Sequence, residues 1–192
     1  MSDDIIELIL TDHETFRRGF ADLDELAVRN DPVELAKAWN PLASLLDVHA
    51  AAEEEVFYPE LLRKGQEDPV EETVDAVGDH NDIRDGVREA NRYPAGSDEW
   101  WAGVRTTREA NDEHLAEEER DALADFRLSA DLELRETLGR RFVEFKSEHP
   151  TADQVDTADK DPQRYVETVE RELGLTGSGS GDGTLGIGGL RG

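Results

Sequence analysis

The stretch LLDVHAAAEEEVFYP, residues 45–59, carries the pattern that decides the fold. Leu46, His49, Glu53 and Val56 recur at intervals of three and four residues, so they share one face of an α-helix. This face continues an apolar stripe and is expected to be buried. His49 and Glu53 are therefore candidate metal ligands, because a buried carboxylate without a partner is costly.

Three further long segments each carry one histidine on an apolar face. His13, His80 and His114 occupy steps in stripes that otherwise consist mostly of apolar residues. Proline, glycine and potential capping residues mark the ends of these segments. The periodicity predicts helices over about residues 3–27, 31–64, 68–92 and 97–128.

The short connections between these segments favour antiparallel neighbours. We therefore predict an all-α fold, an up-down-up-down four-helix bundle, in which the helix midpoints and their histidines lie in one layer of the core. Asn40-Pro41 interrupts the second segment, either as a kink or as a cap followed by a new helix that begins at the proline.

An internal echo adds a second carboxylate to this layer. His49 and His114 both begin a His-x-Ala-x-Glu-Glu frame, so Glu118 is expected to accompany His114 as Glu53 accompanies His49. Without a metal, this many buried polar atoms would compete for few partners. The candidate metal ligands are His13, His49, Glu53, His80, His114 and Glu118.

The remaining polar residues near the layer are expected to be less important. Solvated faces are predicted for Glu54, Glu55, Glu117 and Glu119, although any of them could reach the site. His149 is expected to lie on the surface.

The length of 192 residues suits one domain with additions. We predict a bundle over residues 1–130, a C-terminal helical extension over residues 131–173, and a disordered tail over residues 174–192. The tail holds nine of the sixteen glycines, interleaved with serine. Its few apolar residues could dock on a partner protein, but disorder is the favoured interpretation.

Charge and composition narrow the classes of function. A net charge of −26 argues against binding to nucleic acid or to an anionic membrane surface. The apolar runs are too short to span a membrane, and the residues MSDD before Ile5 contain no basic secretory signal. The absence of cysteine fits a reducing compartment, so we expect a cytoplasmic protein. The acidic, lysine-poor surface is compatible with a high-salt cytoplasm.

With these residues in place, the chain resembles the hemerythrin-like HHE cation-binding family over about residues 3–128. The resemblance rests on His49-x-x-x-Glu53 running into Val56-Phe57-Tyr58-Pro59, on His13 and His80, and on the acidic run after His114. It implies a four-helix bundle around a non-haem site of two iron ions joined by an oxo or hydroxo bridge. The four histidines would be terminal ligands, and Glu53 and Glu118 would bridge the ions. Manganese or zinc would satisfy the same donors.

Two positions depart from the family pattern. Respiratory hemerythrins carry a further histidine where this chain has Arg84, and they place the last carboxylate where it has Glu119. We prefer Glu118 because a spacing of four residues is closer to one helical turn.

Three functions remain open at this point, and the sequence leaves open whether the protein is an enzyme. The favoured one is binding or sensing of dioxygen or a related small ligand, such as peroxide or nitric oxide. The first alternative is an enzyme that decomposes peroxide or oxidises ferrous iron. The second is a scaffold or signalling module with a structural metal.

Overall fold

A computed structural model describes residues 3–175 of the chain. Within this range the chain is helical and contains no strand, which confirms the all-α prediction. Its elements are α1 (Ile5–Ala27), α2 (Pro32–Ala52), the π-helical η1 (Glu53–Phe57), α3 (Tyr58–Lys64), α4 (Pro69–Ala90), α5 (Asp98–Arg120), α6 (Ala122–Ser129), α7 (Leu132–Glu148), the 3₁₀ turn η2 (Ala152–Gln154) and α8 (Pro162–Leu173). The predicted Gly- and Ser-rich tail lies outside the described residues, apart from its first two positions.

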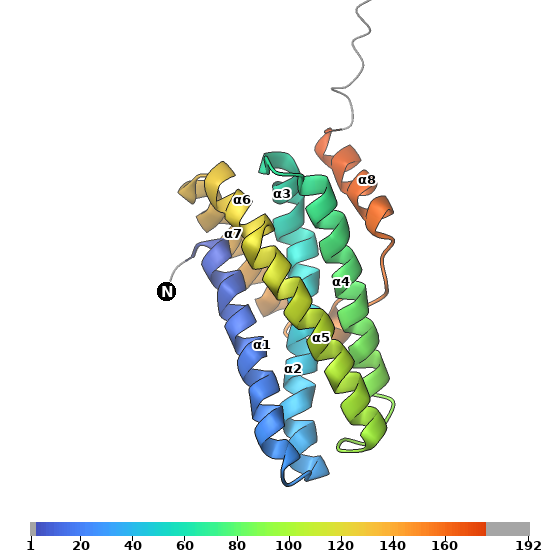
Figure 1. The fold of residues 1–192 in the computed structure, drawn as a ribbon. Helices are drawn as coiled ribbons and strands as arrows, with labels where there is room; N and C mark the ends of the chain where they lie inside the picture. The colour runs from blue at the N-terminus through green and yellow to red at the C-terminus, as the bar shows by residue number, and fades with distance from the viewer. Residues whose placement is uncertain (1–2, 176–192) are drawn as a thin grey trace, which may run out of the picture.

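The four long helices α1, α2, α4 and α5 lie side by side (Figure 1). Contacts of α1 with α2 and α5, and of α4 with the same two helices, enclose a common interior. The α1–α2 and α4–α5 connections lie at one end of this bundle, and α3 and α6 lie at the other. Outside it, α7 packs on α1 and α2, and α8 packs on α3 and α4.

Side-chain caps fix where the helices begin. Asp4, Asp31 and Ser97 accept hydrogen bonds from backbone N–H groups in the first turns of α1, α2 and α5, respectively. Such caps satisfy donors that have no partner within the helix. These three helices therefore start within two residues of the predicted positions.

The second long segment departs from the prediction. Pro41 lies inside α2, so the alternative in which it opens a new helix is wrong. The helix instead changes geometry at η1, where the N–H of Tyr58 donates to the carbonyl of Glu53, five residues earlier. Such π-turns are found at functional sites in many helices, and this one begins at a candidate ligand.

The segment predicted as one helix over residues 97–128 is two helices. Asp121, with φ −111° and ψ −76°, separates α5 from α6. His114 and Glu118 both lie on α5, so the break follows the candidate ligands.

Two apolar clusters fill the bundle, with a polar layer between them. On α1, Ile9 belongs to one cluster and Phe16 to the other, and His13 lies between them. On α4, Val77 and Ile83 flank His80 in the same way. No helix within residues 3–175 is both long and apolar enough to cross a membrane.

Candidate metal centre

The structure brings all six predicted ligands together in the polar layer; we call these residues the inner cluster. His13 comes from α1, His49 from α2, Glu53 from η1, His80 from α4, and His114 and Glu118 from α5. None of these side chains belongs to a residue more than 3 % exposed.

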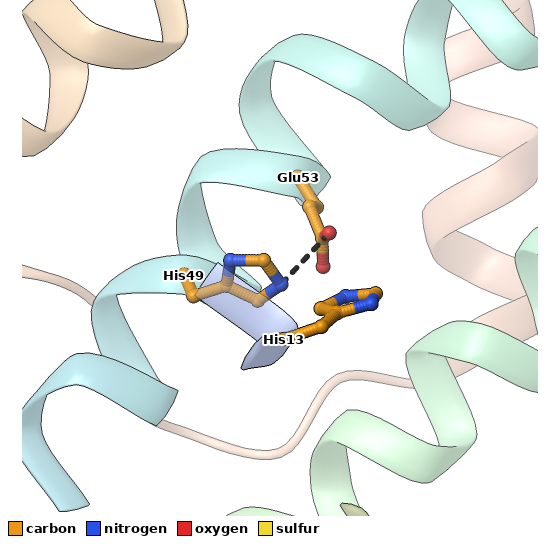
Figure 2. Close-up of side chains that lie close together, drawn as sticks. All are labelled: His13, His49 and Glu53. Atoms are coloured by element: carbon orange, nitrogen blue, oxygen red, sulfur yellow. Dashed lines mark ion pairs between the residues drawn. The ribbon is translucent and has the colours of Figure 1, made fainter. Parts of the chain in front are cut away.

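The inner nitrogens and carboxylate oxygens of this cluster converge. His49 Nε2 lies 2.9 Å from Glu53 Oε1, and His80 Nε2 lies 3.3 Å from Glu53 Oε2. The Nε2 atoms of His80 and His114 are 3.2 Å apart. Figure 2 shows His13, His49 and Glu53 turned toward one another.

These donors form two groups with one shared member. One group is His13, His49 and Glu53; the other is Glu53, His80 and His114; in each, the donor atoms lie within 4.8 Å of one another. Each group could hold a metal cation, and Glu53 belongs to both groups.

Several buried atoms of the inner cluster make close contacts but no hydrogen bond. They are His13 Nε2, His49 Nε2, both carboxylate oxygens of Glu53, and Glu118 Oε2. Without a metal these atoms face one another only in close ion pairs such as His49–Glu53, and a metal cation would satisfy all of them. Imidazole nitrogen and carboxylate oxygen are donors used by iron, manganese and zinc, so the residues fit such a cation.

The outer nitrogen, Nδ1, of each histidine faces a carboxylate from a neighbouring helical element. The four carboxylates are those of Asp12, Glu54, Asp79 and Glu119, and we call them the outer carboxylates. The Nδ1–oxygen distances are 2.9 Å for His49 with Asp12, 2.9 Å for His80 with Glu54, 3.4 Å for His114 with Asp79, and 2.9 Å for His13 with Glu119. An ionised carboxylate only accepts hydrogen bonds, so Nδ1 carries the proton and Nε2 of a neutral imidazole keeps its lone pair for a metal.

Each outer carboxylate is a sequence neighbour of an inner residue. Asp12 precedes His13 on α1 but bonds His49 of α2. The other three are likewise next to an inner residue and lie against a histidine of a different helix: Asp79 precedes His80 and faces His114, Glu54 follows Glu53 and bonds His80, and Glu119 follows Glu118 and bonds His13. Successive helical residues point about 100° apart. A residue next to one that points inward is therefore directed at the adjacent helix.

This arrangement corrects one expectation. Glu54, predicted to lie on a solvated face, is 4 % exposed and bonds His80. Glu119 keeps a side chain that is 29 % exposed and also reaches the site, where it bonds His13 Nδ1, whereas Glu118 Oε2 lies 3.3 Å from the inner Nε2 of the same ring. The geometry therefore favours Glu118 over Glu119 as the ligand.

Sequence reasoning assigned no structural role to Asp12, Asp79 or Tyr58. The buried Tyr58 hydroxyl donates to Glu118 Oε1 at 3.1 Å. Burial, together with Glu118 and Glu53, raises the pKa of Tyr58 well above its usual value, so the hydroxyl keeps its proton. The adjacency of Asp12 and Asp79 to inner histidines was the only signal available in the sequence.

Cations hold three of the outer carboxylates. Arg17 donates to Glu119 at 2.8 Å, and the buried Arg84 donates to Glu54 at 2.9 Å. Lys146 bonds Asp12, and Lys160 bonds Glu54. Arg84 stands where the family pattern has a histidine, and its guanidinium forms an ion pair with Glu54.

The inner cluster is strongly paired when no metal is bound. Burial alone would lower the pKa of His49, but Glu53 and Asp12 outweigh it and raise the pKa to about 10. Burial opposes ionisation of Glu53, yet His49 and His80 hold its pKa well below its usual value. Metal binding would therefore displace protons from imidazoles.

A small cavity of about 110 Å³ reaches the inner cluster between α4 and α5. His114 and Glu118 line its inner part. The other polar residues that line it are Glu72, Asp75, Asp79, Glu117, Arg120 and Asp121.

Comparison with known families agrees with this site. The family model described as hemerythrin HHE cation-binding domain matches residues 4–125. The chain belongs to this hemerythrin family. It is therefore a helical, cation-binding domain, and the match spans the whole inner cluster. No curated protein and no solved structure gave a significant match.

The hemerythrin match ends inside α6, so α7, η2 and α8 lie beyond it. Lys146 of α7 and Lys160, in the segment before α8, nevertheless contact the outer carboxylates.

Proposed function

We propose that this hemerythrin-like domain holds two iron ions in its inner cluster and binds dioxygen or a related small ligand, such as peroxide or nitric oxide. The observation that carries the proposal is the pair of donor groups that share Glu53. His13 and His49 would hold one ion, and His80 and His114 the other.

Glu118 would contribute to both halves of the site. Its Oε2 lies 3.3 Å from His13 Nε2, and its side chain lines the same cavity as His114. This position supports the proposal that Glu118, like Glu53, would help to hold both ions. The Tyr58 hydrogen bond orients the Glu118 carboxylate and leaves Oε2 free to act as a ligand.

The surrounding residues would control what reaches the metal. The cavity between α4 and α5 offers a path for a small molecule to His114 and Glu118. The apolar clusters on either side of the layer exclude bulk water. Bound ferrous iron would supply the electrons that reversible dioxygen binding requires.

Reconstitution tests this proposal. The metal-free chain is loaded with ferrous iron under anaerobic conditions, exposed to air and then deoxygenated. We expect two irons per chain and near-UV and visible absorption bands that appear with oxygen and disappear on its removal. His149→Ala, outside the cluster, is expected to behave as the wild type, whereas His114→Ala should lose iron.

Two outcomes would contradict the proposal. Fewer than two irons bound per chain would exclude the paired site. Absorption bands that persist after deoxygenation would exclude reversible binding of dioxygen.

Turnover of peroxide or of ferrous iron is a second candidate function. The observation that favours it is Arg84, whose engagement with Glu54 leaves the His80 half with one imidazole fewer than the family pattern. Oxygen evolution from peroxide would be compared between wild type, His114→Ala and His149→Ala. Equal rates in all three proteins would rule out catalysis at this centre.

A further inference from the structure

The chain has only four lysines, and two of them contact the surroundings of the inner cluster. The four are Lys37, Lys64, Lys146 and Lys160. Lys146 and Lys160 lie in the C-terminal extension, beyond the end of the family match at residue 125. Each bonds an outer carboxylate, and the two carboxylates serve histidines in different donor groups.

Lys146 connects α7 to His49. Its ammonium bonds Asp12 Oδ2, the oxygen that accepts from His49 Nδ1 at 2.9 Å. Phe142, one helical turn earlier and fully buried, packs edge-on against the His49 ring at a centroid distance of 5.9 Å. The Lys146 ammonium lies 5.3 Å from the centroid of the Phe142 ring. Helix α7, which carries Lys146, thus packs directly against His49 through Phe142.

Lys160 connects the segment before α8 to His80. Its ammonium bonds Glu54 Oε2, while Glu54 Oε1 accepts from His80 Nδ1 at 2.9 Å. The Lys160 backbone is held on α4 by two hydrogen bonds to the Asn81 side chain, of 2.8 and 2.9 Å. Tyr165 donates its hydroxyl to the Glu54 carbonyl. The ammonium is therefore placed by a fixed backbone.

We propose that Lys146 and Lys160 are positioning residues that act through Asp12 and Glu54 to raise the reduction potential of the metal centre. Through these two lysines, the C-terminal extension would stabilise the ferrous state of the metal centre. This inference rests on the proposed iron-binding function.

Two physical effects act in the same direction. A carboxylate shared with an ammonium is a weaker acceptor for the imidazole N–H, so the imidazole donates less charge to a bound metal. Each ammonium also adds a positive charge near the centre, and this charge disfavours the more highly charged ferric state. Removal of either ammonium should therefore lower the potential.

The experiment measures the reduction potential of the iron-loaded full chain. Lys146→Met and Lys160→Met are each expected to raise the ferric-to-ferrous ratio at a fixed potential about tenfold, a fall of about 59 mV for a one-electron step. Lys146→Arg and Lys160→Arg keep the charge and should restore most of the wild-type value. Lys37→Met removes the same charge at an exposed pair with Glu34 and should leave the potential unchanged.

Titration of the metal-free variants with Co²⁺ separates this role from a structural one. Because a neighbouring positive charge has been removed, the methionine variants should bind Co²⁺ at least as tightly as the wild type, with two ions per chain. Weaker Co²⁺ binding that arginine does not restore would overturn the inference and assign the lysines to the fold. A potential equal to that of the wild type in both methionine variants would also overturn it.

A failure of the proposed iron-binding function would give a different experimental result from a failure of the inference about the lysines. If the wild-type chain does not bind two metal ions, the proposed function falls before any lysine variant is compared. If it binds two and only the lysine variants behave contrary to expectation, the inference about the extension falls alone.

Discussion

His49 lies between two carboxylates, with Glu53 at its inner nitrogen and Asp12 at its outer nitrogen. They raise its pKa from 6.5 to about 10, so folding stabilises the protonated ring when no metal is bound. For a group whose pKa is raised by folding, this stabilisation is complete below the unfolded pKa and is lost as the pH rises through the folded pKa. The relevant window therefore runs from pH 6.5 to about pH 10.

This titration predicts a pH-dependent stability of the metal-free protein. We expect the free energy of unfolding to fall by about 2 kcal/mol between about pH 7 and about pH 9. Urea unfolding after treatment with a chelator measures it. His149→Gln, which alters a histidine outside the cluster, should show the same fall. A free energy that stays constant or rises over this interval would contradict the assignment.

The two adjacent glutamates at the end of α5 make a second prediction. Glu118→Gln removes an inner donor and is expected to lower the number of Co²⁺ ions bound per chain. Glu119→Gln leaves that donor in place, weakens the hydrogen bond to His13 and removes the ion pair with Arg17, so affinity should fall about 10–100-fold with the stoichiometry kept. Calorimetric titration with Co²⁺ distinguishes them. The reverse pattern would make Glu119 the ligand.

At the scale of the elements, α4 and α5 approach each other closely at two glycines. A Cβ on Gly86 would lie 2.7 Å from the backbone nitrogen of Thr107, and one on Gly103 would lie 2.5 Å from that of Ala90. These helices carry His80 and His114, whose Nε2 atoms are 3.2 Å apart. The absence of side chains at the two glycines thus permits the spacing of one donor group.

A pair of substitutions in α4 tests this contact. Gly86→Ala is expected to push the helices apart, to lower the free energy of unfolding by about 1–3 kcal/mol and to weaken Co²⁺ binding. Gly78, in the same helix, has nothing within 4 Å of its Cβ position. Gly78→Ala should therefore stabilise the protein by about 0.5–1 kcal/mol. Equal effects in urea unfolding would show that the close approach is unimportant.

For the whole molecule, the important contact is between the C-terminal extension and the bundle. Leu138 and Phe142 of α7 belong to the same apolar cluster as Ile5 and Ile9 of α1. Elements inside and outside the family match therefore share one core. We expect them to unfold together in a single transition.

Neighbouring residues of α7 provide the test. Phe142→Ala creates a cavity in the shared core and is expected to lower the free energy of unfolding by about 3–5 kcal/mol. Val143→Ala, at a position 52 % exposed, should change it by less than about 0.5 kcal/mol. Circular dichroism during urea unfolding would report both values. Two separate transitions in the wild type would contradict a shared core.

The inner cluster could be predicted from sequence because helical periodicity is local. His13 and His80 interrupt apolar stripes, and the His-x-Ala-x-Glu-Glu frame repeats, so consecutive residues alone identify which side chains share a buried face. The same reasoning missed Asp121 and η1, where the helical geometry changes. It also misjudged Glu54, because it treated a residue next to a buried one as facing solvent.

The partners of the histidines depend instead on which helices are neighbours in space. Asp12 is adjacent to His13 in sequence yet bonds His49, and Lys146 reaches the same carboxylate from 134 residues away. Lys160 reaches Glu54 across 106 residues. Periodicity along a single helix contains no information about such pairs, because they form only when separate helices pack. The chain pattern thus identifies candidate donors for a metal, whereas the packing of the bundle and its extension selects the charges that surround them.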